Sequence, residues 1–218
     1  MPLPTFEEPI KIAPPKPYAI SKPNVPEPLH QVAPRNFMTA KEWKEIRDKV
    51  KKECRAEDGE LRCQACGNYV PHVKGNYIEC HELYKINYKK YTATFKEFVG
   101  LCSTCHKFIH SGFLRRLWKE GGITEERYIN VLQSGIGLAK TYDLAVNELT
   151  LKAAEEMYIN TDGVRKLKAI SIEALPTKER NKQWGNWKML YYGETYPPKY
   201  TKYSLWKTAM GIEHSLDS

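Results

Sequence analysis

Two pairs of cysteines constrain this chain more than any other feature. Cys63 and Cys66 form one C-x-x-C pair, Cys102 and Cys105 form a second, and residues 67–101 separate the pairs. A C-x-x-C turn holds two thiolates about one tetrahedral edge apart, and two such turns complete a four-cysteine zinc site. The intervening segment is longer than in a simple zinc finger, so it must form structure of its own. We therefore predict that these four cysteines bind one structural Zn²⁺.

The composition limits the class of protein. A chain of 218 residues can bury a core in one domain, with room for a small satellite domain. Its N-terminus lacks the pattern of a secretory signal, and no apolar run is long enough for a membrane helix. Four of the six cysteines lie in C-x-x-C pairs, which fits zinc binding in a reducing compartment better than disulfides. We predict a cytoplasmic protein with no membrane segment, and its net charge of +8 favours a polyanionic partner.

The first 35 residues hold most of the 14 prolines. Proline removes backbone donors and restricts φ, which excludes a helix interior or a central strand. We predict an extended, largely polyproline-like arm over residues 1–35. Two interpretations stay open: a flexible leader without a role, or an arm that lies along a protein partner or a second subunit.

A helix is predicted over residues 38–54. Thr39 and Glu42 form a capping box, and Trp43, Ile46 and Val50 recur at helical spacing. The helix is amphipathic with a basic outer face, and its apolar side is expected to pack over the zinc region.

The segment between the cysteine pairs has the pattern of a hairpin. Residues 77–84 are aromatic and β-prone, residues 87–90 are polar, and residues 92–101 are the expected returning strand. A helical turn around Phe95 and Phe98 is the alternative for the returning segment.

From Cys102 onward the pattern changes to that of a helix. Cys105, Ile109 and Phe113 are expected on one face, and His106 and His110 lie one turn apart. The predicted order is thus zinc knuckle, hairpin, second knuckle and helix.

This order resembles a known family. The motifs C-x-x-C, E-C-H-E and L-C-x-x-C-H-x-x-x-H, within about residues 60–112, resemble the HNH (ββα-metal, His-Me finger) endonucleases, in their zinc-stabilised branch with two C-x-x-C knuckles. The resemblance implies a hairpin packed on a helix that holds one divalent cation against a scissile DNA phosphate. The expected fold class is α+β, a zinc-knuckle ββα-metal core with flanking helices, an extended Pro-rich N-terminal arm and a small basic and aromatic C-terminal region.

The resemblance also assigns roles by position. His81, His106 and His110 match the ligands of the catalytic divalent ion, which would be Mg²⁺, Mn²⁺, Ni²⁺ or Zn²⁺. Glu82 matches the general base, a position where active members normally carry histidine, and Glu97 stands where the family has asparagine.

A second register of the same motif is possible. It places His81 in the base position and Cys80 in the ligand position. A thiolate is an unusual ligand for Mg²⁺, which prefers oxygen, but not for Zn²⁺. The base is Glu82 in the first register and His81 in the second, so the catalytic candidates are His81 and Glu82.

The residue chemistry leads to a similar site without the family. Two histidines at i and i+4 and a third on a facing strand supply three nitrogen ligands and leave a fourth position open, as in catalytic zinc sites. Phosphodiester hydrolysis also needs a base to activate water, and a free glutamate with a pKa of about 4.3 is a poor one at neutral pH. Strand alternation places Glu79 on the side of His81 and not on that of Glu82.

The remainder reads as scaffold and accessory parts. Helices are predicted at 123–144, weakened late by Gly135 and Gly137, and at about 149–160; residues 187–192 resemble a strand. The segment 165–207 mixes basic and aromatic residues, which suits either a nucleic-acid surface or a small packed module with a solvated basic rim. The candidate nucleic-acid contacts are Arg115, Arg116, Lys119, Lys182 and Lys188.

These features divide the chain into three predicted parts: the arm at 1–35, a helix plus the zinc-bound HNH-like core at 36–122, and the accessory region at 123–218. Two functions of different classes follow. One is a metal-dependent HNH-type endonuclease that hydrolyses phosphodiester bonds of DNA. The other is a catalytically inactive, zinc-scaffolded HNH-fold protein that binds DNA or a protein partner.

Overall fold

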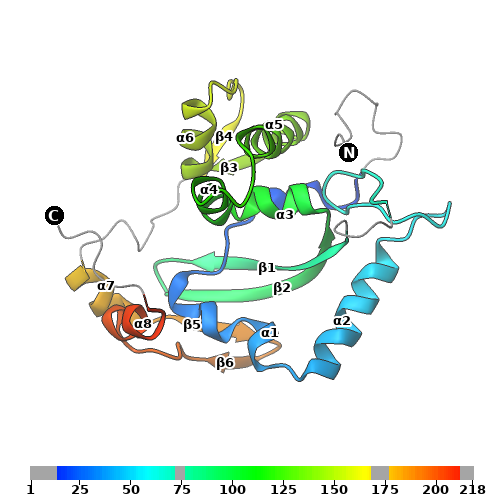
Figure 1. Cartoon of the computed structure of the whole chain (residues 1–218). Coiled ribbons are helices and arrows are strands. Elements are labelled where there is room, and N and C mark those ends of the chain that lie inside the picture. Colours follow the sequence, from blue (N-terminus) through cyan, green and yellow to red (C-terminus); the bar gives the residue numbers. More distant parts are fainter. Residues whose placement is uncertain (1–13, 72–76, 168–176, 212–218) are drawn as a thin grey trace. The chain divides into compact units, whose positions relative to one another are not determined.

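A computed structural model describes residues 14–71, 77–167 and 177–211. These residues form a mixed α+β structure (Figure 1). Its α-helices are α1 (Pro34–Phe37), α2 (Ala40–Glu53), α3 (Ser103–Ile109), α4 (Ser111–Lys119), α5 (Glu125–Thr141), α6 (Glu148–Glu156), α7 (Thr177–Trp184) and α8 (Tyr203–Ala209), with 3-10 turns η1 (Pro17–Ser21) and η2 (Glu27–Val32). Its strands are β1 (Glu79–Asn87), β2 (Thr92–Leu101), β3 (Ala145–Asn147), β4 (Arg165–Leu167), β5 (Lys188–Tyr191) and β6 (Glu194–Tyr196).

The chain divides into two compact units, each built from separated segments. Unit 1 is Met1–Lys22, Lys44–His81 and Phe98–Lys168, and unit 2 is Pro23–Trp43, Glu82–Glu97 and Ala169–Ser218, as far as these ranges are described. Strands β1 and β2 each continue from one unit into the other. Their ends nearest the cysteine pairs belong to unit 1.

The larger sheet has the strand order β1-β2-β5-β6. Strands β1 and β2 form the predicted hairpin, and β2 is a strand over its whole length rather than a helical turn (Figure 1). Strand β2 pairs in parallel with β5, and β5 pairs antiparallel with β6, so the sheet is mixed. Strands β3 and β4 form a separate parallel pair in unit 1.

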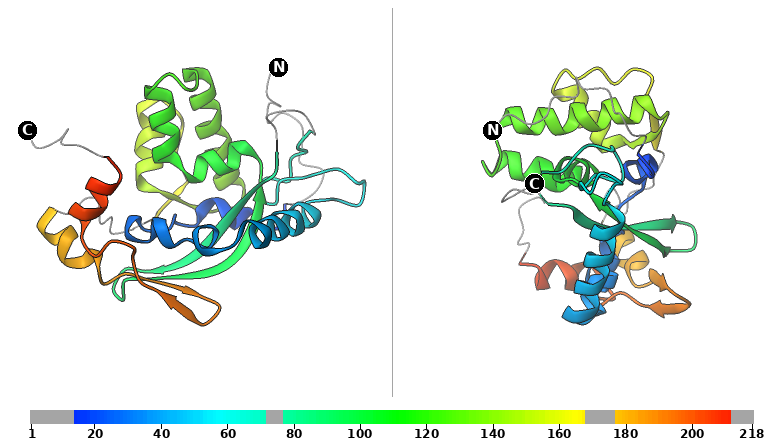
Figure 2. Two further views of the ribbon diagram at one scale, coloured as in Figure 1. Left: turned by 60° about the horizontal axis from the view of Figure 1, so that its bottom comes forward. Right: turned by 90° about the vertical axis from the view of Figure 1, so that its right-hand side faces the viewer.

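Helices α3, α4, α5 and α6 gather into one group in unit 1 (Figures 1 and 2). Helix α5 is continuous through Gly135, although the sequence predicted weakening there. A Cβ atom at Gly135 would lie 2.1 Å from Cδ2 of Phe108 on α3, so the missing side chain lets the two helices approach closely. Side chains of both helices form much of the buried core of this unit.

The helix predicted from Cys102 through Phe113 is interrupted at His110. This residue has φ −91° and ψ 49°, and it ends α3 and precedes α4. Ser111 and Gly112 follow it, and both are weaker helix formers than alanine or leucine. The interruption turns Phe113 away from the face of Cys105 and Ile109, and its side chain is 48% exposed.

The N-terminal segment differs from the extended arm that its prolines predicted. From Pro14 onward it forms η1, η2 and α1, with proline in the first turn of each. Ala19 and Ile20 are buried, and the backbone N–H of Lys16 donates to the carbonyl of Gln64 at 2.9 Å. The segment of η1 is therefore part of unit 1. Residues 1–13 of the predicted arm lie outside the described residues, and an arm that binds a partner or second subunit stays a prediction.

Helix α2 begins as its capping box predicts. The backbone N–H of Thr39 donates to Glu42 at 2.8 Å, and that of Glu42 donates to the Thr39 hydroxyl at 3.2 Å. Val50 is buried beside Gly100 of β2, and Gly100 in turn is hydrogen-bonded to Gln64 of the first cysteine pair. The last turn of α2 thus packs beside the zinc region, as expected.

The three tryptophans of residues 177–211 belong to the buried core. Trp184 and Trp187 are fully buried and Trp206 is 8% exposed. The ring of Trp184 packs on Trp206 and Tyr203, with centroids 5.3 and 5.1 Å away. Of the two interpretations of this segment, the packed module therefore describes the three tryptophans, which cannot stack on bases while buried. The basic side chains Lys182 and Lys188 form part of its exposed rim.

In the described part of the chain, no helix combines the length and apolar character needed to cross a bilayer.

Candidate metal centres

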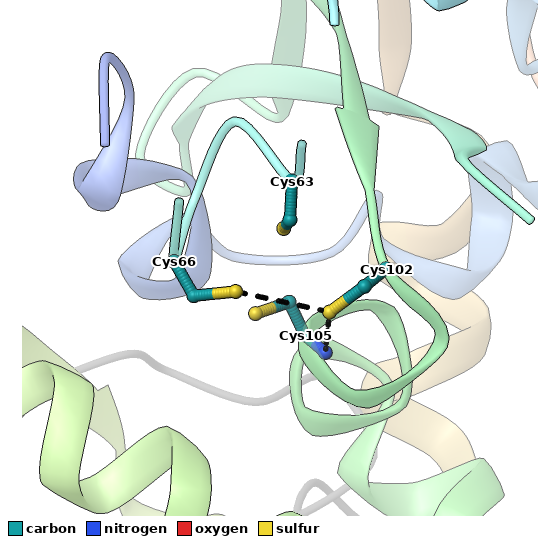
Figure 3. A group of neighbouring side chains, drawn as sticks. All are labelled: Cys63, Cys66, Cys102 and Cys105. Atoms are coloured by element: carbon teal, nitrogen blue, oxygen red, sulfur yellow. Dashed lines mark hydrogen bonds between the residues drawn. The ribbon is translucent and has the colours of Figure 1, made fainter. Parts of the chain in front are cut away.

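The four cysteines of the C-x-x-C pairs converge on one point (Figure 3). Their sulfur atoms all lie within 4.8 Å of one another. The sulfurs of Cys66 and Cys102 are 3.9 Å apart. A tetrahedral site with zinc–sulfur bonds of about 2.3 Å has sulfur–sulfur edges of about 3.8 Å. The donor set and its spacing therefore fit a closed zinc site, as the sequence predicts.

Burial and mutual hydrogen bonding set the charge state of this cluster. Cys63, Cys66 and Cys105 are at most 5% exposed. Burial alone would raise the pKa of Cys63, but hydrogen bonds from Cys102, Cys105 and Cys66 outweigh it and hold that pKa well below its usual value. Hydrogen bonds within the cluster, the largest of them with Cys102, raise the pKa of Cys66 and of Cys105. The four thiols are thus close enough to share hydrogen bonds, and a divalent cation bound there would displace their protons.

Gln64 joins the first cysteine pair to the strand that leads into the second. Its backbone N–H donates to the carbonyl of Gly100 at 2.9 Å, and its side-chain oxygen accepts from the N–H of Gly100 at 2.8 Å. Gln64 is 5% exposed, so these two bonds satisfy polar groups that water does not reach. The two cysteine pairs are therefore held together by a contact that needs no metal.

A second cluster joins three histidines of unit 1. His81 lies on β1, His106 on α3, and His110 at the junction of α3 and α4. Their rings are separated by centroid distances of 5.1, 5.0 and 4.7 Å and cross at angles of 68°, 78° and 88°. One nitrogen from each lies within 4.8 Å of the others, so the three can hold a metal ion. The break at His110 preserves this convergence.

Glu79 orients His106. Its carboxylate lies 2.6 Å from Nδ1 of His106. The hydrogen bond from His106 lowers the pKa of Glu79 below its usual value, although partial burial opposes the shift. An ionised carboxylate only accepts, so Nδ1 carries the proton and Nε2 of a neutral ring keeps its lone pair. Metal-binding histidines are commonly held in this way.

Strand alternation places Glu79 and Glu82 on opposite faces of β1. Glu79 and His81 are two residues apart on β1 and share one face, whereas Glu82 points to the opposite face. Glu82 is 5% exposed, while Cys80 is only partly buried. The alternation is visible in the sequence, but the partner of Glu79 is not, because it lies on a helix distant along the chain.

The predicted nucleic-acid contacts occupy both units. Arg115, Arg116 and Lys119 are exposed on α4. Arg115 pairs with Glu156 at 3.0 Å, and Arg116 lies 3.9 Å from Glu120. These ion pairs are exposed and therefore weak, so a phosphate can compete for either arginine. Lys182 on α7 and Lys188 on β5 are also exposed.

The described residues thus form a mixed α+β protein with two candidate metal clusters, one of four cysteines and one of three histidines. A scan against family models and searches of curated proteins and of solved structures gave no significant match to this chain.

Proposed function

We propose that this chain is a metal-dependent, HNH-type endonuclease that hydrolyses phosphodiester bonds of DNA. The observation that carries the proposal is the convergence of His81, His106 and His110 on one point, with Glu79 orienting one of the rings. In this account the four cysteines hold a structural Zn²⁺, and the histidines hold a second divalent ion.

The chain's own residues prepare the histidine site for a cation. Three protein ligands leave coordination positions open for water or substrate, unlike the closed four-cysteine cluster. An all-imidazole donor set suits Ni²⁺ or Zn²⁺ better than Mg²⁺ or Mn²⁺, which prefer oxygen. A divalent ion there would supply neutralisation of charge on the scissile phosphate and leaving oxygen. Exposed cations on α4, α7 and β5 would add attraction for the DNA backbone.

A second candidate function is favoured by one observation. Glu82 follows His81 directly but lies on the opposite face of β1, and it occupies the position where the resembled family normally has its histidine base. Without a base on the metal side, the same scaffold would hold two ions and bind DNA or a protein without cleaving. Glu82 would then be a buried structural carboxylate.

Cleavage assays separate the two functions. Supercoiled plasmid and single-stranded DNA are incubated with the zinc-loaded chain and added Mg²⁺, Mn²⁺, Ni²⁺ or Zn²⁺. The nuclease account predicts cleavage that His110→Ala abolishes and that His30→Ala, an exposed histidine outside the cluster, leaves unchanged. Loss of cleavage in Glu82→Gln, with folding intact, would support Glu82 as the base.

Two other results would contradict parts of the nuclease proposal. Cleavage that persists in Glu82→Gln would remove Glu82 from the mechanism. No cleavage with any of the four metals, together with salt-sensitive DNA binding, would favour the non-cleaving protein.

A further inference from the structure

The four-cysteine cluster poses an electrostatic problem once it holds zinc. Four thiolates carry more negative charge than one Zn²⁺ neutralises, so a loaded site is an anion. Three of these cysteines are at most 5% exposed, so water screens that charge poorly. A buried charge is stable only when a counter-charge or hydrogen-bond donors compensate it.

Hydrogen-bond donors from the local backbone meet this need only in part. The N–H of Cys105 approaches the sulfur of Cys102 at 3.5 Å, which caps the start of α3. A second backbone donor, the N–H of Cys102, acts on Cys63. Both donors are neutral, and charge-assisted donors are roughly twice as strong.

The helix that packs against α3, α5, carries a cationic side chain in its first turn. Arg127 lies in the first turn of α5, whose N-cap Thr124 accepts from the Arg127 backbone N–H at 3.1 Å. Helices α3 and α5 pack against each other (Figure 1), and Cys102 is the N-cap of α3. The position of Arg127 on α5 is therefore set by a helix cap and by the contact between the two helices.

The guanidinium of Arg127 has an unused donor. Its Nη1 is enclosed by protein and makes no hydrogen bond within the described residues. A buried, unsatisfied N–H group costs about 1–3 kcal/mol, so such a group calls for an acceptor. Burial lowers the pKa of Arg127, and the negative charge of Cys102 opposes that shift. The cysteine cluster, through Cys102, is thus the acceptor that we infer for this donor.

We propose that Arg127 is the charge-compensating partner of the four-cysteine zinc site, with its guanidinium facing the Cys102 thiolate. Arginine suits this position because it stays charged when buried and sheds water more readily than lysine. The inference rests on the zinc site and not on nuclease activity. Its consequence is a zinc site that electrophiles attack slowly. Zinc-bound sulfurs are already deprotonated, so a neighbouring cation cannot raise the thiolate fraction and only lowers the nucleophilicity of each thiolate.

The test uses the full zinc-loaded chain. Zinc release by the thiol reagent DTNB is followed with a coloured zinc indicator, and zinc affinity is measured by competition with a chelator. We expect Arg127→Gln to release zinc about 10–100-fold faster and to bind it correspondingly less tightly, the range typical for loss of a group that supports a metal ligand. Glutamine has nearly the helix propensity of arginine, so α5 itself should persist.

Matched variants keep the test decisive. Arg47→Gln removes an exposed arginine on α2 and should release zinc at the native rate. Arg127→Lys keeps the positive charge but loses the planar guanidinium, so its rate of zinc release should lie between those of the native chain and Arg127→Gln. This variant replaces Arg127→Gln in the test if the glutamine variant does not fold. Release from Arg127→Gln at the native rate, with folding intact by circular dichroism, would overturn the proposal. So would a native chain that binds no zinc, and neither result depends on DNA cleavage.

Discussion

Gly100 lies where three segments of unit 1 meet, and its substitution by alanine tests the packing around the first cysteine pair. A Cβ atom there would lie 2.1 Å from the sulfur of Cys54, 2.8 Å from Cγ2 of Ile78 and 3.1 Å from Cγ1 of Val50. The first two distances are far below van der Waals contact. Alanine can therefore be accommodated only if the side chains of Cys54, Ile78 and Val50 shift away from β2.

The expected destabilisation follows from two opposing effects. Overpacking of a well-packed core costs about 1–3 kcal/mol. Replacing glycine by alanine restricts the unfolded chain, which returns about 0.4–1 kcal/mol. We therefore expect Gly100→Ala to lower the free energy of unfolding by about 1–2 kcal/mol. For a protein of this size that corresponds to a fall in Tm of about 2–8 °C.

Gly137 provides a control of opposite sign. It lies within α5, and a Cβ atom there would have no neighbour within 4 Å. Gly137→Ala should raise the stability by up to about 1 kcal/mol through helix propensity alone. Differential scanning calorimetry of both variants in zinc-containing buffer measures the two shifts. A Gly100→Ala variant that melts at or above the native temperature would refute the close packing described for Gly100.

Three further predictions concern single groups. Glu79→Ala should weaken divalent-ion binding at the histidine cluster about 10–100-fold, measured by calorimetric titration of the zinc-loaded chain. Glu79→Gln can still accept a hydrogen bond from His106, so its affinity for the ion should fall less. Burial raises the pKa of the Cys54 thiol to about 12, so iodoacetamide should alkylate it about a thousandfold more slowly at pH 8 than an exposed thiol, by peptide mass spectrometry. Because that pKa is higher in the folded chain than in the unfolded one, the contribution of Cys54 to stability is complete below about pH 8.5 and should be lost as pH rises toward 12, measured by urea unfolding.

Local patterns in the sequence were sufficient to predict the features of the candidate site that depend only on the spacing of residues. The C-x-x-C pairs, the hairpin between them and the helical spacing of His106 and His110 each reflect interactions within a few residues, and the structure has all three. The capping box at Thr39 belongs to the same class, since its donors and acceptors are three residues apart.

Contacts between distant segments were not visible in the sequence. The proline-rich start predicted an extended arm, but its 3-10 turn is held by the burial of Ile20 and a bond to Gln64, far along the chain. Trp184 and Trp206 interleave with lysines along the sequence, yet they point inward because helices α7 and α8 pack against each other. Likewise, the sequence predicted the helix that carries Arg127 but not the packing of that helix against α3.

The central claim is that this chain holds two different metal centres, and the metal content of three proteins tests it most directly. The native chain, Cys102→Ser and His110→Ala are purified, dialysed against a mixture of Zn²⁺, Mn²⁺ and Ni²⁺ at low concentration, and analysed by native mass spectrometry. The account predicts a tightly held Zn²⁺ that only Cys102→Ser loses and a second divalent ion that His110→Ala loses. A native chain whose only metal persists in His110→Ala would contradict the histidine centre, and with it the proposed chemistry.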